Sequence, residues 1–295
     1  MPDGTAQDFE PHRRRLTGLA YRMLGSVAEA EDVVQDAWLR WQGTERDTVR
    51  DSGAFLHRVV ARLCLDRLKS ARVQRETYIG PWLPEPVVDA EALRAPDANE
   101  WADDLSFALM LALERLSPLE RAAFLLHDVF DLDFGEIATT LGRSEVACRQ
   151  LAVRARAHVR AARPRFTIPA DQGERLVRAF LGAVQHGDTP TLARLLAEDA
   201  VLHTDGGGRR AAARNLIRGR DHILRLYAGL ARKSRLPRME TVVRPLRING
   251  LPGIVAIEPD GTLQTIAFEI AGGRISAIYV VSNPDKLGHL APLVR

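Results

Sequence analysis

Cysteine and histidine are scarce in this chain of 295 residues, which holds 2 cysteines and 8 histidines. The two cysteines, Cys64 and Cys148, lie too far apart in the sequence to form a metal-binding or redox motif. Both fall within apolar helical patterns, so we expect them to be small core residues. No two histidines are three or four residues apart, a spacing that a metal-binding helix favours. We therefore expect neither a metal site nor a cofactor.

Long apolar runs are also missing. No stretch approaches the ~18 residues that a membrane-spanning helix requires, and residues 1–15 contain no apolar segment of the secretory type. Hydrophobic residues still make up 46% of the chain, which is enough to build folded cores. The length allows two or three domains. We expect a cytoplasmic protein without membrane contact.

Charge is nearly balanced in total but segregated along the chain. The formal net charge is +3. Residues 57–75 contain six lysines and arginines against one acid, and residues 143–165 contain seven arginines against one acid. Between them, residues 80–104 contain seven acids, four prolines and one base. The two basic segments suggest two surfaces that meet a polyanion. Solvated arginine-rich helix faces are the alternative, and charge alone does not separate the two.

Residues 8–74 have the periodicity of three helices that share one core. Ser26 is typical of an N-cap, and Glu29 three residues later completes a capping box. The apolar side of the helix that follows carries Val33, Val34, Ala37, Trp38 and Trp41.

Residues 105–163 are also helical and end in a helix-turn-helix pattern. A short helix ends at Gly142, a favoured C-cap residue, and its inward positions are Ile137, Ala138 and Leu141. Ser144 then caps a second helix, whose apolar positions are Val146, Leu151 and Val153. In such a motif the second helix enters the major groove of DNA, although any helical hairpin with a glycine can imitate the pattern.

Residues 174–295 change period. Amphipathic helices and a glycine turn at residues 206–208 come first, and four strand-like runs separated by turn signals follow. Helices followed by an antiparallel meander predict an α+β domain.

The three blocks together resemble one family of proteins. The first two resemble regions 2 and 4 of extracytoplasmic-function RNA polymerase sigma factors, and the third resembles the SnoaL-like (NTF2-like) extension of the sigma-J type. Three motifs mark that type, and here they are WLPEP at Trp82–Pro86, DGGGR at Asp205–Arg209 and NPDKL at Asn283–Leu287. The resemblance implies four parts: region 2 (1–77), a linker (78–104), region 4 (105–166) and a SnoaL-like domain (167–295).

The resemblance also implies two partners, core RNA polymerase and promoter DNA, and assigns residues to them. Base edges and phosphates at −35 would be contacted by Ser144, Glu145, Arg149, Gln150, Arg154 and Arg156. The melted strand at −10 would be held by Arg58, Arg62, Lys69 and Arg72, while Arg67 is either a DNA contact or structural. The acidic second helix would repel DNA, so its polymerase-binding residues would be Asp32, Gln35, Asp36 and Leu39. Acids matched to the helix dipole are the alternative reading.

The linker and the C-terminal motifs are expected to regulate the sigma regions in cis. Prolines keep the linker extended, and its acids would let it follow nucleic-acid channels of the polymerase. Trp82 would dock on the C-terminal domain or the sigma regions, or it would only fix the end of the third helix. The contacts would come from Trp82, Leu83, Pro84, Glu85, Pro86, Asp205, Gly206, Gly207, Gly208, Arg209, Asn283, Pro284, Asp285, Lys286 and Leu287.

Two other functions are alternatives to this one. SnoaL-like relatives use a cavity for acid–base chemistry, for which the candidates here are His203, Asp205, Glu269 and Tyr279. We expect no enzyme, because Asp205 lies in a glycine turn typical of an exposed loop, although an unknown small ligand in the cavity stays open. A DNA-binding regulator that works without polymerase is the other alternative, and the region-2-like helix disfavours it.

Overall fold

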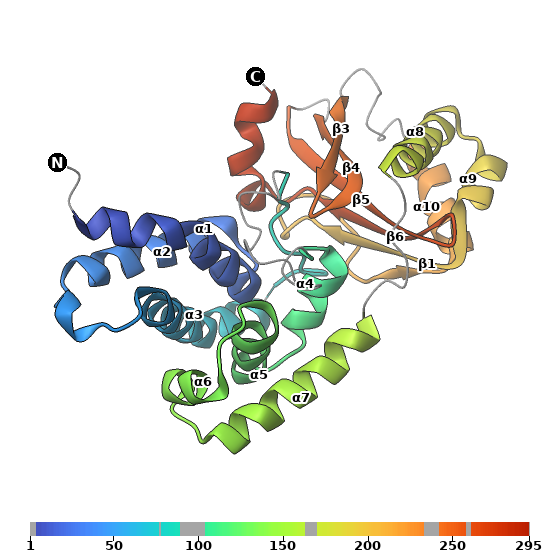
Figure 1. The fold of residues 1–295 in the computed structure, drawn as a ribbon. Helices are drawn as coiled ribbons and strands as arrows, with labels where there is room; N and C mark the ends of the chain where they lie inside the picture. The colour runs from blue at the N-terminus through green and yellow to red at the C-terminus, as the bar shows by residue number, and fades with distance from the viewer. Residues whose placement is uncertain are drawn as a thin grey trace. The chain divides into compact units, whose positions relative to one another are not determined.

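The computed structural model describes residues 4–76, 78–88, 104–162, 170–232, 242–257 and 261–294. The chain forms two compact units (Figure 1). The first consists of residues 1–76 and 89–163, and the second of residues 77–88 and 164–295. Helical blocks followed by an α+β domain confirm the predicted fold class. Within the described ranges, no helix is both long enough and apolar enough to cross a membrane.

The N-terminal part of the first unit is built from α1 (Gly4–Leu24), α2 (Val27–Gln42) and α3 (Ser52–Glu76), with the short η1 (Arg46–Thr48) between the last two. Ser26 caps α2 as predicted, because its Oγ accepts a hydrogen bond from the Glu29 amide at 3.1 Å. The buried positions of α2 include four of the five predicted. The fifth, Trp38, is half-buried and packs edge-on against Phe9, with ring centroids 5.1 Å apart.

The rest of the first unit comprises α4 (Phe107–Glu114), α5 (Pro118–Phe124), the π-helical turn η3 (Leu125–Val129), α6 (Phe134–Leu141) and α7 (Glu145–Ala162). Gly142 ends α6 with a φ of 63°, in the left-handed region that glycine tolerates. Ser144 then caps α7, accepting from the Ala147 amide at 3.3 Å. The helices α6 and α7 therefore form the predicted helix-turn-helix.

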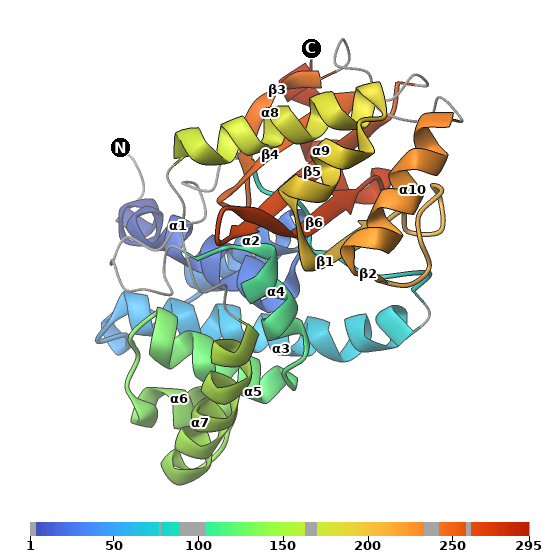
Figure 2. The same ribbon diagram turned by 90° about the vertical axis from the view of Figure 1, so that its right-hand side faces the viewer.

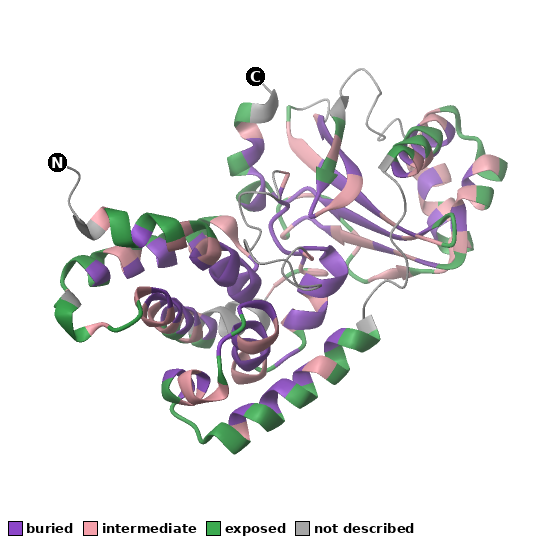
Figure 3. Ribbon diagram, in the orientation of Figure 1, coloured by how far each residue is buried: buried purple, intermediate pink, exposed green. Residues whose placement is uncertain are grey.

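The helix α7 departs from the prediction at two positions. Leu151 is buried as expected, but Val146 and Val153 are 65% and 59% exposed. Among its described side chains, α7 buries Cys148, Leu151, Ala152, Ala155 and Val159. At 100° per residue the two valines point away from that face, and Figure 3 shows exposed and buried residues alternating along α7.

The two cysteines are free and buried in the first unit, as predicted. Burial raises the pKa of both the Cys64 and the Cys148 thiol. Neither side chain is therefore a reactive surface thiol.

The second unit contains a six-stranded sheet with the strand order β2-β1-β6-β5-β4-β3. The meander from β3 (Val242–Ile248) through β4 (Leu251–Ile257) and β5 (Leu263–Ala271) to β6 (Arg274–Val281) is antiparallel, as predicted. However, β1 (Leu196–Asp205) pairs with β6 in parallel, and the short β2 (Ile217–Arg218) adds to its other edge. The sheet is therefore mixed.

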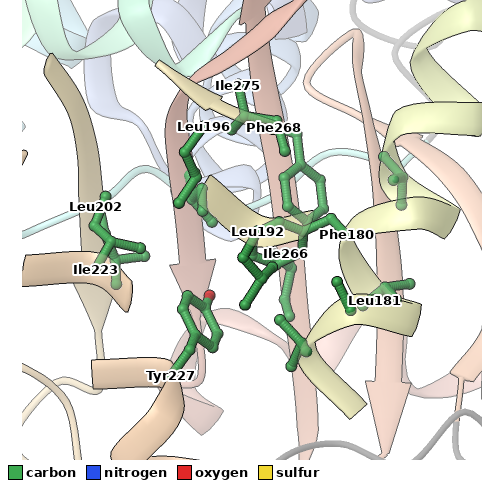
Figure 4. Close-up of a cluster of buried hydrophobic side chains, with 14 of the residues drawn as sticks. Phe180, Leu181, Leu192, Leu196, Leu202, Ile223, Tyr227, Ile266, Phe268 and Ile275 are labelled. Atoms are coloured by element: carbon green, nitrogen blue, oxygen red, sulfur yellow. The ribbon is translucent and has the colours of Figure 1, made fainter. Parts of the chain in front are cut away.

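Three helices cover one face of this sheet: α8 (Ala170–His186), α9 (Thr189–Leu195) and α10 (Arg220–Arg232) (Figure 2). Their apolar residues pack with the inward side chains of β1, β4, β5 and β6. Phe180 lies at the centre, edge-on to both Tyr227 and Phe268, with centroids 5.3 and 5.0 Å away (Figure 4). Hydrophobic side chains thus fill this side of the sheet. Beyond β6 the chain ends in the 3-10 helices η5 (Pro284–Lys286) and η6 (Gly288–Val294).

Candidate nucleic-acid interface and linker-binding site

The N-terminal half of α7 presents polar groups to solvent. Arg149 donates to the Glu145 carboxylate at 2.8 Å, and its guanidinium lies over the Phe134 ring, 4.9 Å from the centroid. Ser144, Glu145 and Gln150 are exposed as well. In a helix-turn-helix this half of the second helix meets base edges. These four side chains are accessible on that half of α7, and their contact with the −35 element stays a prediction.

The two arginines further along α7 are held by acids of α5 and η3. Arg154 Nε donates to Glu120 Oε1 at 2.9 Å and is 59% exposed. Arg156 Nε donates to Asp128 Oδ1 at 2.5 Å and is only 29% exposed. Both lie on the flanks of the outward face of α7 rather than at its centre.

The basic residues of α3 are in different situations. Arg58 lies over the Phe55 ring at 5.7 Å, and the exposed Lys69 pairs with Asp66 at 2.8 Å. Arg62 donates instead to α6, with Nη2 at 2.8 Å from the Thr139 carbonyl oxygen and Nε at 3.1 Å from that of Thr140. The side chain of Arg72 lies outside the part of the chain that the structure describes.

Arg67 has a structural role, one of the two predicted. It donates to Asp36 at 2.9 Å and to the Glu29 carbonyl oxygen at 3.1 Å, and it lies 3.7 Å from Asp32. It therefore ties α3 to α2. The remaining predicted residues of α2 are open to solvent: Gln35 is exposed, Asp32 has a side chain that is 73% exposed, and Leu39 is 58% exposed.

The linker residues 78–88 are bound to the C-terminal domain through Asp205. This carboxylate accepts hydrogen bonds from the Tyr78 hydroxyl at 2.5 Å, from the Leu83 amide at 2.9 Å and from Lys286 Nζ at 2.8 Å. Asp205 is 1% exposed, so the prediction of an exposed loop position was wrong. The reason is that a distant segment covers the turn, and burial together with the bond to Asp205 raises the pKa of Tyr78.

Lys286 completes this centre. Its ammonium group also donates to the Leu83 carbonyl oxygen and lies over the rings of Trp82 and Tyr78, 4.4 and 4.9 Å from their centroids. A buried charge is tolerated only when it is paired and hydrogen-bonded. The WLPEP, DGGGR and NPDKL motifs therefore meet at one site. Trp82 contacts Lys286 of the C-terminal domain, which is the first of the places predicted for this side chain.

The glycines of the DGGGR motif allow close approach at this site. A Cβ at Gly207 would lie 2.3 Å from Asn283 Nδ2, and one at Gly208 would lie 2.9 Å from Ile79. Both residues also have φ angles in the left-handed region, 60° and 72°. On the outer side of the site, Arg209 pairs with Asp285 at 2.9 Å.

A second attachment holds the end of the segment. The Val87 amide donates to Asn249 Oδ1 at 3.0 Å, and the Asn249 amide donates back to the Val87 carbonyl oxygen at 2.8 Å. His289 donates to the Pro86 carbonyl oxygen at 2.8 Å. Three residues of this site, Tyr78, Asn249 and His289, were not predicted from the sequence. Only Tyr78 carried a signal, as an aromatic residue a few positions before WLPEP.

The four acid–base candidates do not form one site. Tyr279 donates to Glu269 at 2.7 Å and its ring lies 4.9 Å from that of His203. Burial and the charge of Glu269 raise the pKa of Tyr279. Asp205 belongs to the linker-binding site instead. Alternation along β1 places His203 on the opposite face from the core residue Leu202.

Comparisons with known proteins identify the same three blocks of the chain. Family models match three segments in order: Sigma-70 region 2 over residues 9–73, Sigma-70, region 4 over residues 106–159 and a SnoaL-like domain over residues 177–281. The three matches follow the order of the helical blocks and the sheet.

Relatives from Mycobacterium tuberculosis extend along nearly the whole chain. The ECF RNA polymerase sigma factor SigJ is 39% identical over 291 residues, 95% of this chain and 92% of SigJ. The probable sigma factor SigI is 32% identical over 290 residues, 98% of this chain and 96% of SigI. The crystal structure of SigJ matches with a TM-score of 0.75 and 36% identity, covering 96% of this chain and 98% of SigJ.

Proposed function

Because the chain belongs to the extracytoplasmic-function RNA polymerase sigma factors, we propose that each of its parts carries one step of promoter-directed initiation. The protein is a sigma factor that binds core RNA polymerase and promoter DNA, and its family is not enzymatic. It works where core polymerase transcribes, in the cytoplasm.

Polymerase binding is assigned to the outer side of α2. Asp32, Gln35 and Leu39 are exposed there, and Asp36 keeps a half-exposed carboxylate although it accepts from Arg67. An acidic side chain beside an exposed leucine suits a basic surface with an apolar depression.

DNA binding is divided between α7 and α3. Arg149 and Gln150 are proposed to contact base edges at −35, with Ser144 and Glu145 at the helix start. Arg154 and Arg156 lie on the flanks, where they suit phosphates. Arg58, Arg62, Lys69 and Arg72 are proposed to hold the melted strand at −10.

Regions 2 and 4 must separate before both promoter elements are bound. Within the first unit they are in contact: Arg62 bonds to α6, and Arg121 donates to the Met23 carbonyl oxygen. The two elements lie about 25 base pairs apart, roughly 85 Å of duplex. A compact body of about 150 residues has a radius of gyration of only about 15 Å. The observed packing therefore represents a closed form.

The bonding of the linker to the C-terminal domain is the observation that supports regulation in cis. The linker joins regions 2 and 4, so whatever holds it affects how they separate. The carboxylate of Asp205 and the ammonium group of Lys286 hold residues 78–83, and Asn249 and His289 hold residues 86–87. We propose that this attachment sets the balance between the closed and the open form.

Run-off transcription with purified core polymerase and a promoter selected from genomic fragments tests the proposal. Full-length protein is compared with truncations after Phe166 and after Leu287, and with Asp205→Asn, which removes the acceptor charge of the linker-binding site. Asp199→Asn is the matched control, since Asp199 is an exposed carboxylate on the same strand.

Transcription that depends on the protein, and that changes in the truncations and Asp205→Asn but not in Asp199→Asn, is the expected result. Dependence without any such change would contradict regulation in cis. Duplex binding without transcription would instead favour a regulator that works without polymerase.

A further inference from the structure

The outward face of α7 carries two valines that the fold does not use. Val146 and Val153 are 65% and 59% exposed, and among the described residues only two other large hydrophobic side chains, Leu39 and Ile79, are comparably exposed. The valines are seven positions apart, which is nearly two helical turns, so they project in the same direction. They form one narrow apolar strip on the second helix of the helix-turn-helix.

Valine is a poor choice for an exposed helical position on local grounds. Its branched Cβ restricts the side chain in a helix, and alanine or a straight-chain polar residue would stabilise α7 more. Two exposed valines on the same face therefore indicate a contact with an apolar group outside the chain.

The surroundings of the strip indicate which contact this is. Arg149 and Gln150 lie between the two valines along the helix, and both are exposed. Arg154 borders the strip and is 59% exposed. A protein partner with an apolar surface would have to cover these donors, whereas the major groove of a duplex accepts hydrogen bonds and phosphate contacts from all three.

The major groove also contains one exposed apolar group, the C5-methyl of thymine. We propose that Val146 and Val153 contact the methyl groups of two thymines in the −35 element. The helix α7 would then recognise these thymines by apolar contact, while Arg149 and Gln150 contact the bases that lie between them. This inference rests on the proposed −35 role of α7. At 1.5 Å per residue the valines are about 10 Å apart along the helix axis, which corresponds to about three base pairs.

Deoxyuridine is the direct probe, because it differs from thymidine only by lacking that methyl group. Holoenzyme is assembled from core polymerase and the full chain, and a promoter with a functional −35 element is selected from a random library. Each thymine of the element is then replaced singly by deoxyuridine. We expect two positions, about three base pairs apart, at which the affinity falls about fourfold, the factor that corresponds to one buried methyl group.

Variants link each position to its side chain. In holoenzyme with Val146→Ala, thymidine and deoxyuridine should bind equally at one of the two positions, and with Val153→Ala they should bind equally at the other. Gln150→Ala is the matched control on the same face, and it should change base preference while keeping both methyl effects.

The outcomes separate this inference from the function on which it rests. If scrambling the −35 element leaves binding unchanged, the −35 role of α7 fails. If −35 dependence persists while every deoxyuridine is silent, or while the selected element contains no thymine, the methyl contact is wrong and the −35 role stands. Valine variants that weaken binding to the thymidine and deoxyuridine forms equally at all positions, while the wild type discriminates them, would also overturn it.

Discussion

His57 shows how one buried side chain makes stability depend on pH. It is 4% exposed in α3, its Nδ1 donates to the Gly53 carbonyl oxygen at 2.7 Å, and its ring packs on Phe130. Burial lowers the pKa of His57 from 6.5 to about 4. Above pH 6.5 both the folded and the unfolded chain leave it neutral. Between pH 6.5 and 4 only the unfolded chain takes up the proton, so stability is lost as the pH falls.

Replacing this histidine should therefore flatten the pH dependence. Between pH 7 and pH 5, protonation of this histidine in the unfolded chain lowers the free energy of unfolding by about 2 kcal/mol. The substitution His57→Leu should remove most of that decrease. The measurement is the free energy of urea unfolding at both pH values. His158→Leu, at an exposed position of α7, should keep the full loss. An equal pH dependence in the two variants would show that His57 is not the buried neutral group described.

At the same scale, sequence could identify the linker-binding residues but not their environment. Asp205 was found from its motif, and yet the glycine turn indicated exposure, since nothing local shows that Leu83 and Lys286 come to cover it. Val146 and Val153 were predicted to be buried and are exposed. An apolar residue in a helical pattern is assigned to the core, and only the packing of α7 shows which of its two sides is covered.

At the scale of elements, the contact between α3 and α6 can be tested through one side chain, Arg62. Carbonyl groups in the last turn of a helix lack intrahelical partners, and a cation there is favourable. Arg62 supplies that cation from α3, at the carbonyls of Thr139 and Thr140. The same arginine was predicted to bind DNA at −10. Both roles are compatible only if Arg62 leaves α6 when regions 2 and 4 separate.

Arg62→Ala should therefore shift the protein toward the open form before any DNA is present. Fluorescent labels at Gln42→Cys and Ala157→Cys, both exposed positions, report the distance between regions 2 and 4 by energy transfer. The two native thiols are buried and should stay unlabelled. We expect lower transfer in Arg62→Ala and unchanged transfer in Lys69→Ala, because Lys69 pairs with Asp66 of its own helix.

The rate of open-complex formation then tests the other proposed role of Arg62, which is to hold the melted strand at −10. Both substitutions should slow promoter opening if Arg62 and Lys69 hold the melted strand. Unchanged energy transfer in Arg62→Ala would contradict its role as a latch, whatever the effect on opening.

Helices and the antiparallel meander were predictable as elements because their signals are local. Capping residues such as Ser26 and Ser144, and the glycine at 142, mark helix ends within a few positions. The parallel pairing of β1 with β6 was not predictable, since the two strands are more than 60 residues apart in the chain and no local pattern in either strand indicates its partner.

At the scale of the molecule, the linker belongs to both the sigma regions and the C-terminal domain. Its sequence connects regions 2 and 4, while residues 77–88 are part of the second compact unit. A linker held by the C-terminal domain cannot at the same time follow a channel of the polymerase. Initiation should therefore require these residues to leave the linker-binding site.

A reversible covalent lock tests this requirement. A Cβ at Gly208 would lie 3.3 Å from the Cβ of Ile79, close to the ~3.5–4.5 Å of a disulfide. Ile79→Cys with Gly208→Cys should therefore form one on oxidation. The left-handed φ of 72° at Gly208 costs a cysteine about 1–2 kcal/mol, but this strain is common to the oxidised and reduced forms.

Run-off transcription by the oxidised double variant should be several-fold lower than by the same protein after reduction, because only reduction lets the linker leave. Each single-cysteine variant treated in the same way should show no difference, which controls for the oxidant and for the substitutions. Equal transcription by the locked and the reduced protein would mean that the linker stays on the C-terminal domain during initiation. Regulation in cis would then have to act by moving that domain together with the linker, rather than by releasing it.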